Sequence, residues 1–201
     1  MAEHISQELT PVEQDVVACL KRSVRRTFTV MARATMPSAE PTVEKKKIIQ
    51  WMGRYNVIKP HGYLFTAVMR YRYGSKKDLM SCNGIMAIFY PEMVGDIIVK
   101  MLQLERKPVE DDILDACGEF CNVVSGSFKV ELTKMGYNEL ELGLPITFVG
   151  EVDELFEYKG KEEIDVTYID DLDEPFLKVI FACDESTIFN ESKLIKKEAK
   201  K

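Results

Sequence analysis

The sequence lacks the marks of a protein that crosses or leaves through a membrane. No window approaches the roughly 18 uninterrupted apolar residues that a spanning helix needs. The first eight residues are acidic, whereas a signal peptide begins basic and continues apolar. We therefore expect a cytoplasmic protein with no membrane insertion.

Basic residues are too few and too scattered for a nucleic-acid-binding protein. The 201 residues include 27 Lys+Arg against 33 Asp+Glu, which gives a formal net charge of −6. The one basic cluster away from the termini, 45–47, lies in no nucleic-acid motif. With 46% hydrophobic residues the chain is long enough to bury one core without metals or disulfides.

Histidine is scarce, and the cysteines are odd in number. The two histidines, His4 and His61, leave a serine or cysteine nucleophile with only His61 as a candidate base. Cys117 and Cys121 are one helical turn apart, but a structural zinc needs four convergent ligands, so we expect reduced core thiols. An acidic cluster at 165–174 could bind a cation, but a solvated loop between strands is the favoured interpretation.

Hydrophobic periodicity predicts an α+β fold. Helices are expected at 11–36, 93–104 and 109–135, the first capped by Thr10 and Glu13 and the last ended by Gly136. A minor helix is possible at 48–52. Strands are expected at 64–71, 79–90, 140–149, 155–158, 164–169 and 176–183, with a hairpin turn at 74–78.

A long helix followed by strands occurs twice along the chain. Each half alone would leave a sheet face bare, so the two halves should share one sheet. We predict one domain over 1–201, with its core at about 10–185 and a lysine-rich tail at 186–201. Its architecture should be two-layer, with a mostly antiparallel sheet packed by long helices and an internal pseudo-repeat.

The helix at 109–135 presents a polar stripe opposite its apolar side. Six residues fall within about 40° of one direction at 100° per residue: Asp115, Gly118, Glu119, Asn122, Gly126 and Lys129. A solvated face explains most such stripes. Two mid-helix glycines each cost about 1 kcal/mol relative to alanine, and they suggest a surface that another molecule approaches closely.

At these residues the chain resembles the CheX branch of the CheC/CheX/FliY chemotaxis phosphatases. The family motif appears as Asp115-x3-Glu119-x2-Asn122-x22-Pro145, followed after the site by Gly126 and Lys129. The first long helix has no second Glu-x2-Asn, so the resemblance implies a single site per chain. Segment 37–61 and the tail look like additions to a chain of CheX length.

The resemblance implies removal of phosphate from the aspartyl phosphate of a CheY-like receiver domain. Asn122 would hold the attacking water and Glu119 would pair with the receiver's lysine, while Asp115 would support that pair. Gly118, Gly126, Lys129 and Pro145 would be supporting residues. The chain would need no cofactor of its own, because the Mg²⁺ belongs to the receiver, and it would form an edge-to-edge homodimer.

Two other functions remain open from the sequence. A CheX-like module could dock a receiver or a flagellar-switch protein without hydrolysis, although the retained amide at 122 argues against this. A ligand sensor could use the aromatic residues of the expected sheet, although these residues suit core packing equally well: Phe65, Tyr71, Phe89, Phe148 and Phe181.

Overall fold

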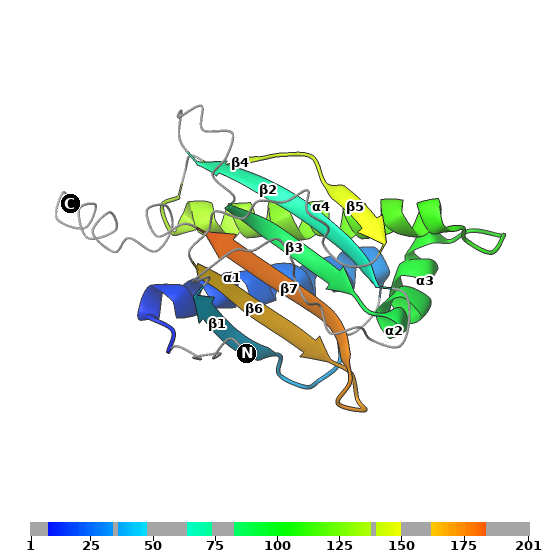
Figure 1. Cartoon of the computed structure of the whole chain (residues 1–201), viewed down its shortest axis with the longest axis horizontal. Helices are drawn as coiled ribbons and strands as arrows, with labels where there is room; N and C mark the ends of the chain where they lie inside the picture. The colour runs from blue at the N-terminus through cyan, green and yellow to red at the C-terminus, as the bar shows by residue number, and fades with distance from the viewer. Residues whose placement is uncertain are drawn as a thin grey trace.

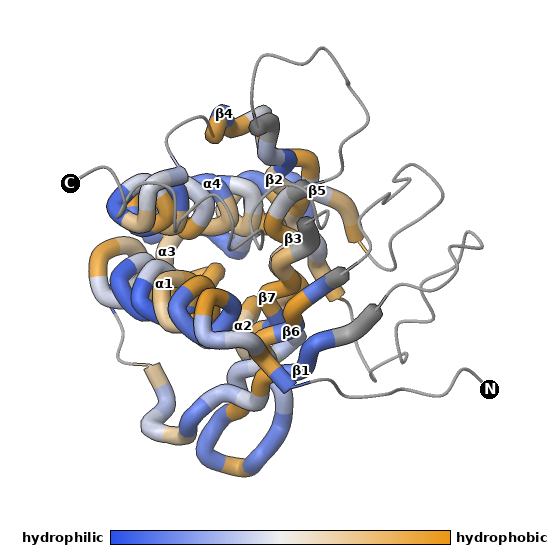
Figure 2. The backbone as a smooth tube through the Cα atoms, turned by 90° about the vertical axis from the view of Figure 1, so that its left-hand side faces the viewer, coloured by the Kyte–Doolittle hydropathy of each residue, from blue (hydrophilic) through white to orange (hydrophobic). Residues whose placement is uncertain are grey.

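Two long helices lie on one face of an antiparallel sheet (Figures 1 and 2). The computed structural model describes residues 8–33, 36–47, 64–73, 83–137, 140–149 and 162–183. Within these ranges seven strands form one sheet in the order β1-β6-β7-β3-β2-β4, and β5 also pairs with β2. The predicted two-layer α+β architecture is confirmed.

Apart from a strand at 42–47, the elements follow one another in the order that the periodicity predicts. Helix α1 and strands β1 to β3 precede α4 and strands β4 to β7, and short helical turns over 91–102 connect the two halves. The bounds are α1 Pro11–Thr27, β1 Thr42–Lys47, β2 Phe65–Tyr73, β3 Asn83–Phe89, α2 Pro91–Met93, α3 Val99–Leu102, α4 Glu110–Lys134, β4 Leu140–Leu142, β5 Ile146–Val149, β6 Glu162–Ile169 and β7 Pro175–Cys183.

Helix α1 begins at the predicted cap and ends earlier than predicted. The Thr10 backbone N–H donates to Glu13 Oε2 at 2.8 Å, and the Glu13 N–H donates to Thr10 Oγ1 at 3.3 Å. The expected continuation to residue 36 is wrong, because the helix passes into a π-helical turn at Phe28–Ala32 and Arg33 adopts a left-handed φ of 48°. Three β-branched residues near this end disfavour further helix: Thr27, Thr29 and Val30.

Strand β1 lies inside the segment that the sequence suggested as an insertion. It pairs antiparallel with β6 from Thr42↔Thr167 to Lys47↔Glu162 and forms one edge of the sheet. A buried ion pair between Lys45 Nζ and Glu13 Oε1, 2.7 Å apart, joins this edge to the start of α1. Part of the segment is therefore integral to the sheet.

The core lies between the helix layer and the sheet. Phe120 of α4 meets Phe28 and Phe89 edge to face, with ring centroids 5.6 and 5.5 Å apart, and Phe128 meets Phe181 at 5.1 Å. Such aromatic pairs add about 0.5–1.5 kcal/mol each beyond their buried area. These contacts fix the rotation of α4 and therefore the direction in which its polar stripe points.

Several expectations fall outside the described residues. These are the minor helix at 48–52, the hairpin turn at 74–78, the strand at 155–158, the two histidines and the tail at 186–201. No helix in the described ranges is long and apolar enough to span a membrane.

Candidate functional site

Both ends of helix α4 are capped by residues close to them in the sequence. At the start, Asp112 Oδ2 accepts the Val109 backbone N–H at 2.8 Å, and Asp112 Oδ1 accepts from Arg106 Nη2 at 2.9 Å. The Arg106 contact and then the backbone bond lower the pKa of Asp112. At the end, Gly136 has the left-handed φ of 101° expected of a C-cap glycine.

The apolar side of α4 faces the sheet as predicted. Cys117 and Cys121 are both 0% exposed, and burial raises the pKa of Cys121 to about 12 and that of Cys117 further. Both thiols are therefore packed in the core as neutral groups. No group of three potential metal ligands occurs in the described part of the chain.

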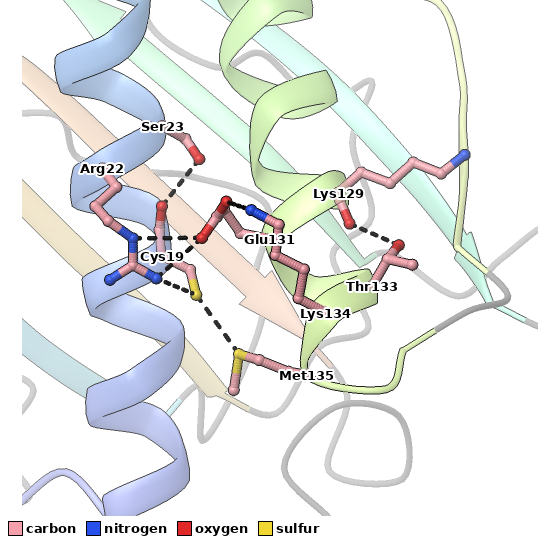
Figure 3. A network of polar contacts seen from close by, with 8 residues as sticks. All are labelled: Cys19, Arg22, Ser23, Lys129, Glu131, Thr133, Lys134 and Met135. Carbon is pink, nitrogen blue, oxygen red and sulfur yellow. Dashed lines mark hydrogen bonds and ion pairs between the residues drawn. The ribbon is translucent and has the colours of Figure 1, made fainter.

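A polar network joins the facing sides of α4 and α1 (Figure 3). Arg22 Nη2 lies 3.1 Å from Glu131 Oε2 and also 3.1 Å from Cys19 Sγ. Lys134 pairs with the other oxygen of Glu131. Lys134 first, and then Arg22, lower the pKa of Glu131. The network braces α4 against α1, and Lys129 extends away from it (Figure 3).

The three motif residues of α4 share its solvent-facing side. Asp115 and Glu119 are exposed and stand one turn apart, and Asn122 is half-buried in the next turn. Asn122 Nδ2 donates to Glu119 Oε2 at 3.4 Å, so the two side chains touch. This bond is longer than the usual 2.7–3.2 Å, and a cationic partner could replace it at small cost. The predicted stripe therefore brings a carboxylate and an amide together at the surface.

The chain's own edge strand packs against Gly118, so the space beside this glycine is not open to another molecule. It is buried, and a Cβ built there would lie 3.0 Å from Thr147 Cγ2 and 3.9 Å from Pro145 Cβ. The interpretation of this glycine as clearance for a partner is wrong. Its role is to let β5 pack closely against α4, beside Glu119.

The edge strand reaches this position through a β-bulge. Leu142 pairs with Tyr71 and Ile146 pairs with Val68, so three residues of the edge face two residues of β2. The extra residue reverses the alternation of side chains. Because of it, Thr147 points at α4.

Pro145 lies in this bulge, where a strand tolerates proline. The resemblance implied a supporting role for Pro145, and the structure puts its ring about 4 Å from the Gly118 position. Sequence reasoning missed Thr147 and the bulge itself. The available signal was the pair Gly143 and Pro145 inside an otherwise strand-like run.

Gly126 and Lys129 continue the stripe beyond Asn122. Among the described residues, a Cβ at Gly126 would meet no atom within 4 Å outside the neighbouring backbone of its own helix, so no packing contact there requires a glycine. Lys129 is half-buried, and its carbonyl accepts a hydrogen bond from Thr133 Oγ1 at 2.9 Å. For Gly126, clearance for a partner stays a prediction.

The acidic cluster and the aromatic residues, which the sequence offered as other possible sites, have structural roles. Asp170 Oδ1 accepts the backbone N–H groups of Leu172 and Glu174 at 2.8 and 3.0 Å, so that part of the acidic cluster forms a turn. Asp165 pairs with Lys178 at 2.6 Å. Of the five aromatic residues considered for a ligand sensor, four are buried in the core and Phe148 is half-buried.

Comparison with known proteins gives a consistent assignment. Residues 80–168 match the family model of the chemotaxis phosphatase CheX, a range that contains the whole motif from Asp115 to Pro145. The chemotaxis protein CheX of Desulfovibrio desulfuricans superposes with a TM-score of 0.60 at 16% identity, covering 85% of this chain and 99% of that one. No curated protein matches the chain by sequence.

Two further solved structures share the same fold. FliY of Thermotoga maritima has a TM-score of 0.60 at 15% identity, covering 95% of this chain and 99% of that one. A chain of the FliM–SpeE complex from H. pylori has a TM-score of 0.57 at 12% identity, covering 96% and 97%. The family match over 80–168 and the fold shared with CheX and FliY together support a CheX-like assignment for this chain.

Proposed function

We propose that this protein is a phosphatase that hydrolyses the aspartyl phosphate of a CheY-like receiver domain. The observation that carries the proposal is the contact between Asn122 and Glu119 on the exposed side of α4, within a segment that matches CheX. Both side chains lie on a helix braced by its core contacts and by the Arg22–Glu131 ion pair. A site on such a rigid element can enter a partner's active site without rearranging.

Asn122 would position the attacking water. A carboxamide offers two N–H donors and one carbonyl acceptor. One N–H already bonds to Glu119, which leaves the other N–H and the carbonyl to orient a water in line with phosphorus. Such positioning, rather than proton transfer by the enzyme, is the main contribution that a protein makes to phosphoryl transfer.

Glu119 would pair with the lysine beside the receiver's phosphorylated aspartate. Its carboxylate is exposed, and Asp115, also exposed, adds negative charge one turn away. A charge-assisted hydrogen bond contributes about 1.5–3 kcal/mol, so this pair should act chiefly on binding. The Mg²⁺ of the reaction belongs to the receiver, and we propose no cofactor for this chain.

The test is the lifetime of the receiver phosphate with wild type, Asn122→Ala and Glu119→Ala. We expect wild type to shorten it, and Asn122→Ala to reduce the rate by about 10²-fold, the scale of losing a positioned group. Glu119→Ala should weaken binding of the receiver by one to two orders of magnitude. The proposal is wrong if both variants keep the wild-type rate.

A non-catalytic docking function is the second candidate, favoured by the structural similarity to the FliM–SpeE chain and to FliY. It predicts that the protein binds a receiver or a flagellar-switch protein and leaves the phosphate lifetime unchanged. Binding that survives in Asn122→Ala, together with an inactive wild type, would select it over the phosphatase.

We also propose a cytoplasmic location, where a receiver substrate would be met, and an edge-to-edge homodimer. Within the described residues the sheet has two edges, β1 on one side and the β4/β5 pair on the other. Sedimentation of the purified protein would test the dimer.

A further inference from the structure

The bulge beside the candidate site carries a leucine that the fold leaves in water. Leu144 is 84% exposed, the largest value among the exposed large hydrophobic residues of the described chain. The flanking backbone is fixed, because the Gly143 N–H donates to the Arg70 carbonyl at 2.9 Å and Pro145 packs near Gly118. Because the backbone is already fixed, a partner that covers this side chain need not order the backbone on binding.

The register of the edge strand places this leucine at the level of Asn122. Thr147, after the bulge, abuts Gly118 of α4. Before the bulge the strand pairs with Tyr71, whose hydroxyl donates to the Ser125 carbonyl of α4 at 3.3 Å. The bulge therefore spans the stretch of helix between Gly118 and Ser125. Asn122 lies within this stretch, only about 40° around the helix from Gly118.

The surface around Leu144 has a definite chemistry. On α4 the exposed carboxylates Asp115 and Glu119 precede Asn122, and no Lys or Arg of the described chain pairs with either of them. Like charges at i and i+4 repel each other, so this row favours a partner that brings a cation. A partner that meets the amide, the carboxylates and the leucine together must present a cation beside an apolar patch.

We propose that Leu144 is a docking contact for the receiver domain that Asn122 and Glu119 engage. This inference rests on the proposed function and extends it to the partner's surface: the receiver should present an apolar patch next to its phosphorylation pocket. Leu144 touches no reacting atom in this scheme. It should therefore act on KM, while kcat is set by Asn122.

The experiment compares Leu144→Ser with Leu172→Ser as a matched control. Leu172 has the same side chain and is 81% exposed, but it lies in the β6–β7 turn, far from the β4/β5 edge in Figure 1. Steady-state dephosphorylation of a CheY-like receiver gives KM and kcat, and titration with its beryllofluoride form gives Kd. Burial of a leucine predicts a rise of about tenfold or more in KM and Kd for Leu144→Ser, with kcat unchanged. Leu172→Ser should change none of these constants.

Each outcome decides at least one of the two proposals. If wild type is active and Leu144→Ser has unaltered KM and Kd, the docking contact is wrong and the phosphatase proposal is retained. A wild type that binds the receiver without turnover overturns the phosphatase, and the Kd of Leu144→Ser then decides the docking contact. A wild type that neither binds nor hydrolyses overturns both.

Discussion

The two glycines of α4 should respond in opposite ways to alanine. Gly126 lies in the helix interior, and an added Cβ would meet no atom of the described residues within 4 Å outside the neighbouring backbone of its own helix. Alanine is favoured over glycine there by about 1 kcal/mol, because it restricts the unfolded chain and propagates the helix better. Gly126→Ala should therefore raise the free energy of unfolding by about 1 kcal/mol and Tm by roughly 2–4 °C for a domain of this size.

Gly118→Ala should gain the same helix preference, but a steric clash opposes this gain. Its Cβ would lie 3.0 Å from Thr147 Cγ2, closer than the 3.5–4.0 Å of an ordinary carbon contact. The edge strand must shift to relieve this contact, which should cancel the gain. We expect Gly118→Ala to be at least about 1 kcal/mol less stable than Gly126→Ala. Adding Thr147→Ser, which removes Cγ2, should recover much of that difference.

Urea denaturation followed by far-UV circular dichroism measures all four proteins under one set of conditions. An equal gain from both alanines would refute the close packing of β5 on α4. No gain from Gly126→Ala would refute the open environment of that residue. If Gly126→Ala is more stable yet binds the receiver less tightly, the glycine is retained for close approach of a partner.

Three further predictions concern buried and paired groups. Lys45→Met leaves the carboxylate of Glu13 buried without its cation and should destabilise the fold by about 3–5 kcal/mol, measured by urea denaturation; a wild-type midpoint would contradict the buried pair. Cys117 and Cys121, whose thiol pKa values are raised by burial, should resist maleimide at pH 8 until urea unfolds the protein, and rapid native labelling at either residue by mass spectrometry would show otherwise. Because Lys134 and Arg22 lower the pKa of Glu131, its contribution to stability is present above its ordinary pKa and is lost as pH falls through the lowered value; Glu131→Gln should lose less stability in that acid range.

The local features of the site were predictable from sequence because they depend on neighbours along the chain. The limits of α4, its capping glycine Gly136 and the shared face of Glu119 and Asn122 follow from helical periodicity. The α1 cap at Thr10 was predictable for the same reason. Prediction and structure agree closely where residues within about four positions of each other determine the local structure.

The remaining features depend on contacts between distant segments. Gly118 looked like clearance for a partner because the sequence does not reveal that Thr147 packs there. Strand β1 was hidden because it is an edge strand rich in charge: Val43 packs on the core and Lys45 reaches Glu13, while its other residues give no apolar alternation. Gly143 and Pro145 hinted at an irregularity in this strand, but the single extra residue is established only by the pairing with β2.

The most direct test of the central claim is the release of inorganic phosphate from a phosphorylated CheY-like receiver under single-turnover conditions, with this protein in excess. The account predicts that wild type accelerates release over the receiver's own rate and that Asn122→Ala, bound to the same extent, does not. Release at the receiver's own rate, with wild type fully bound, would contradict it.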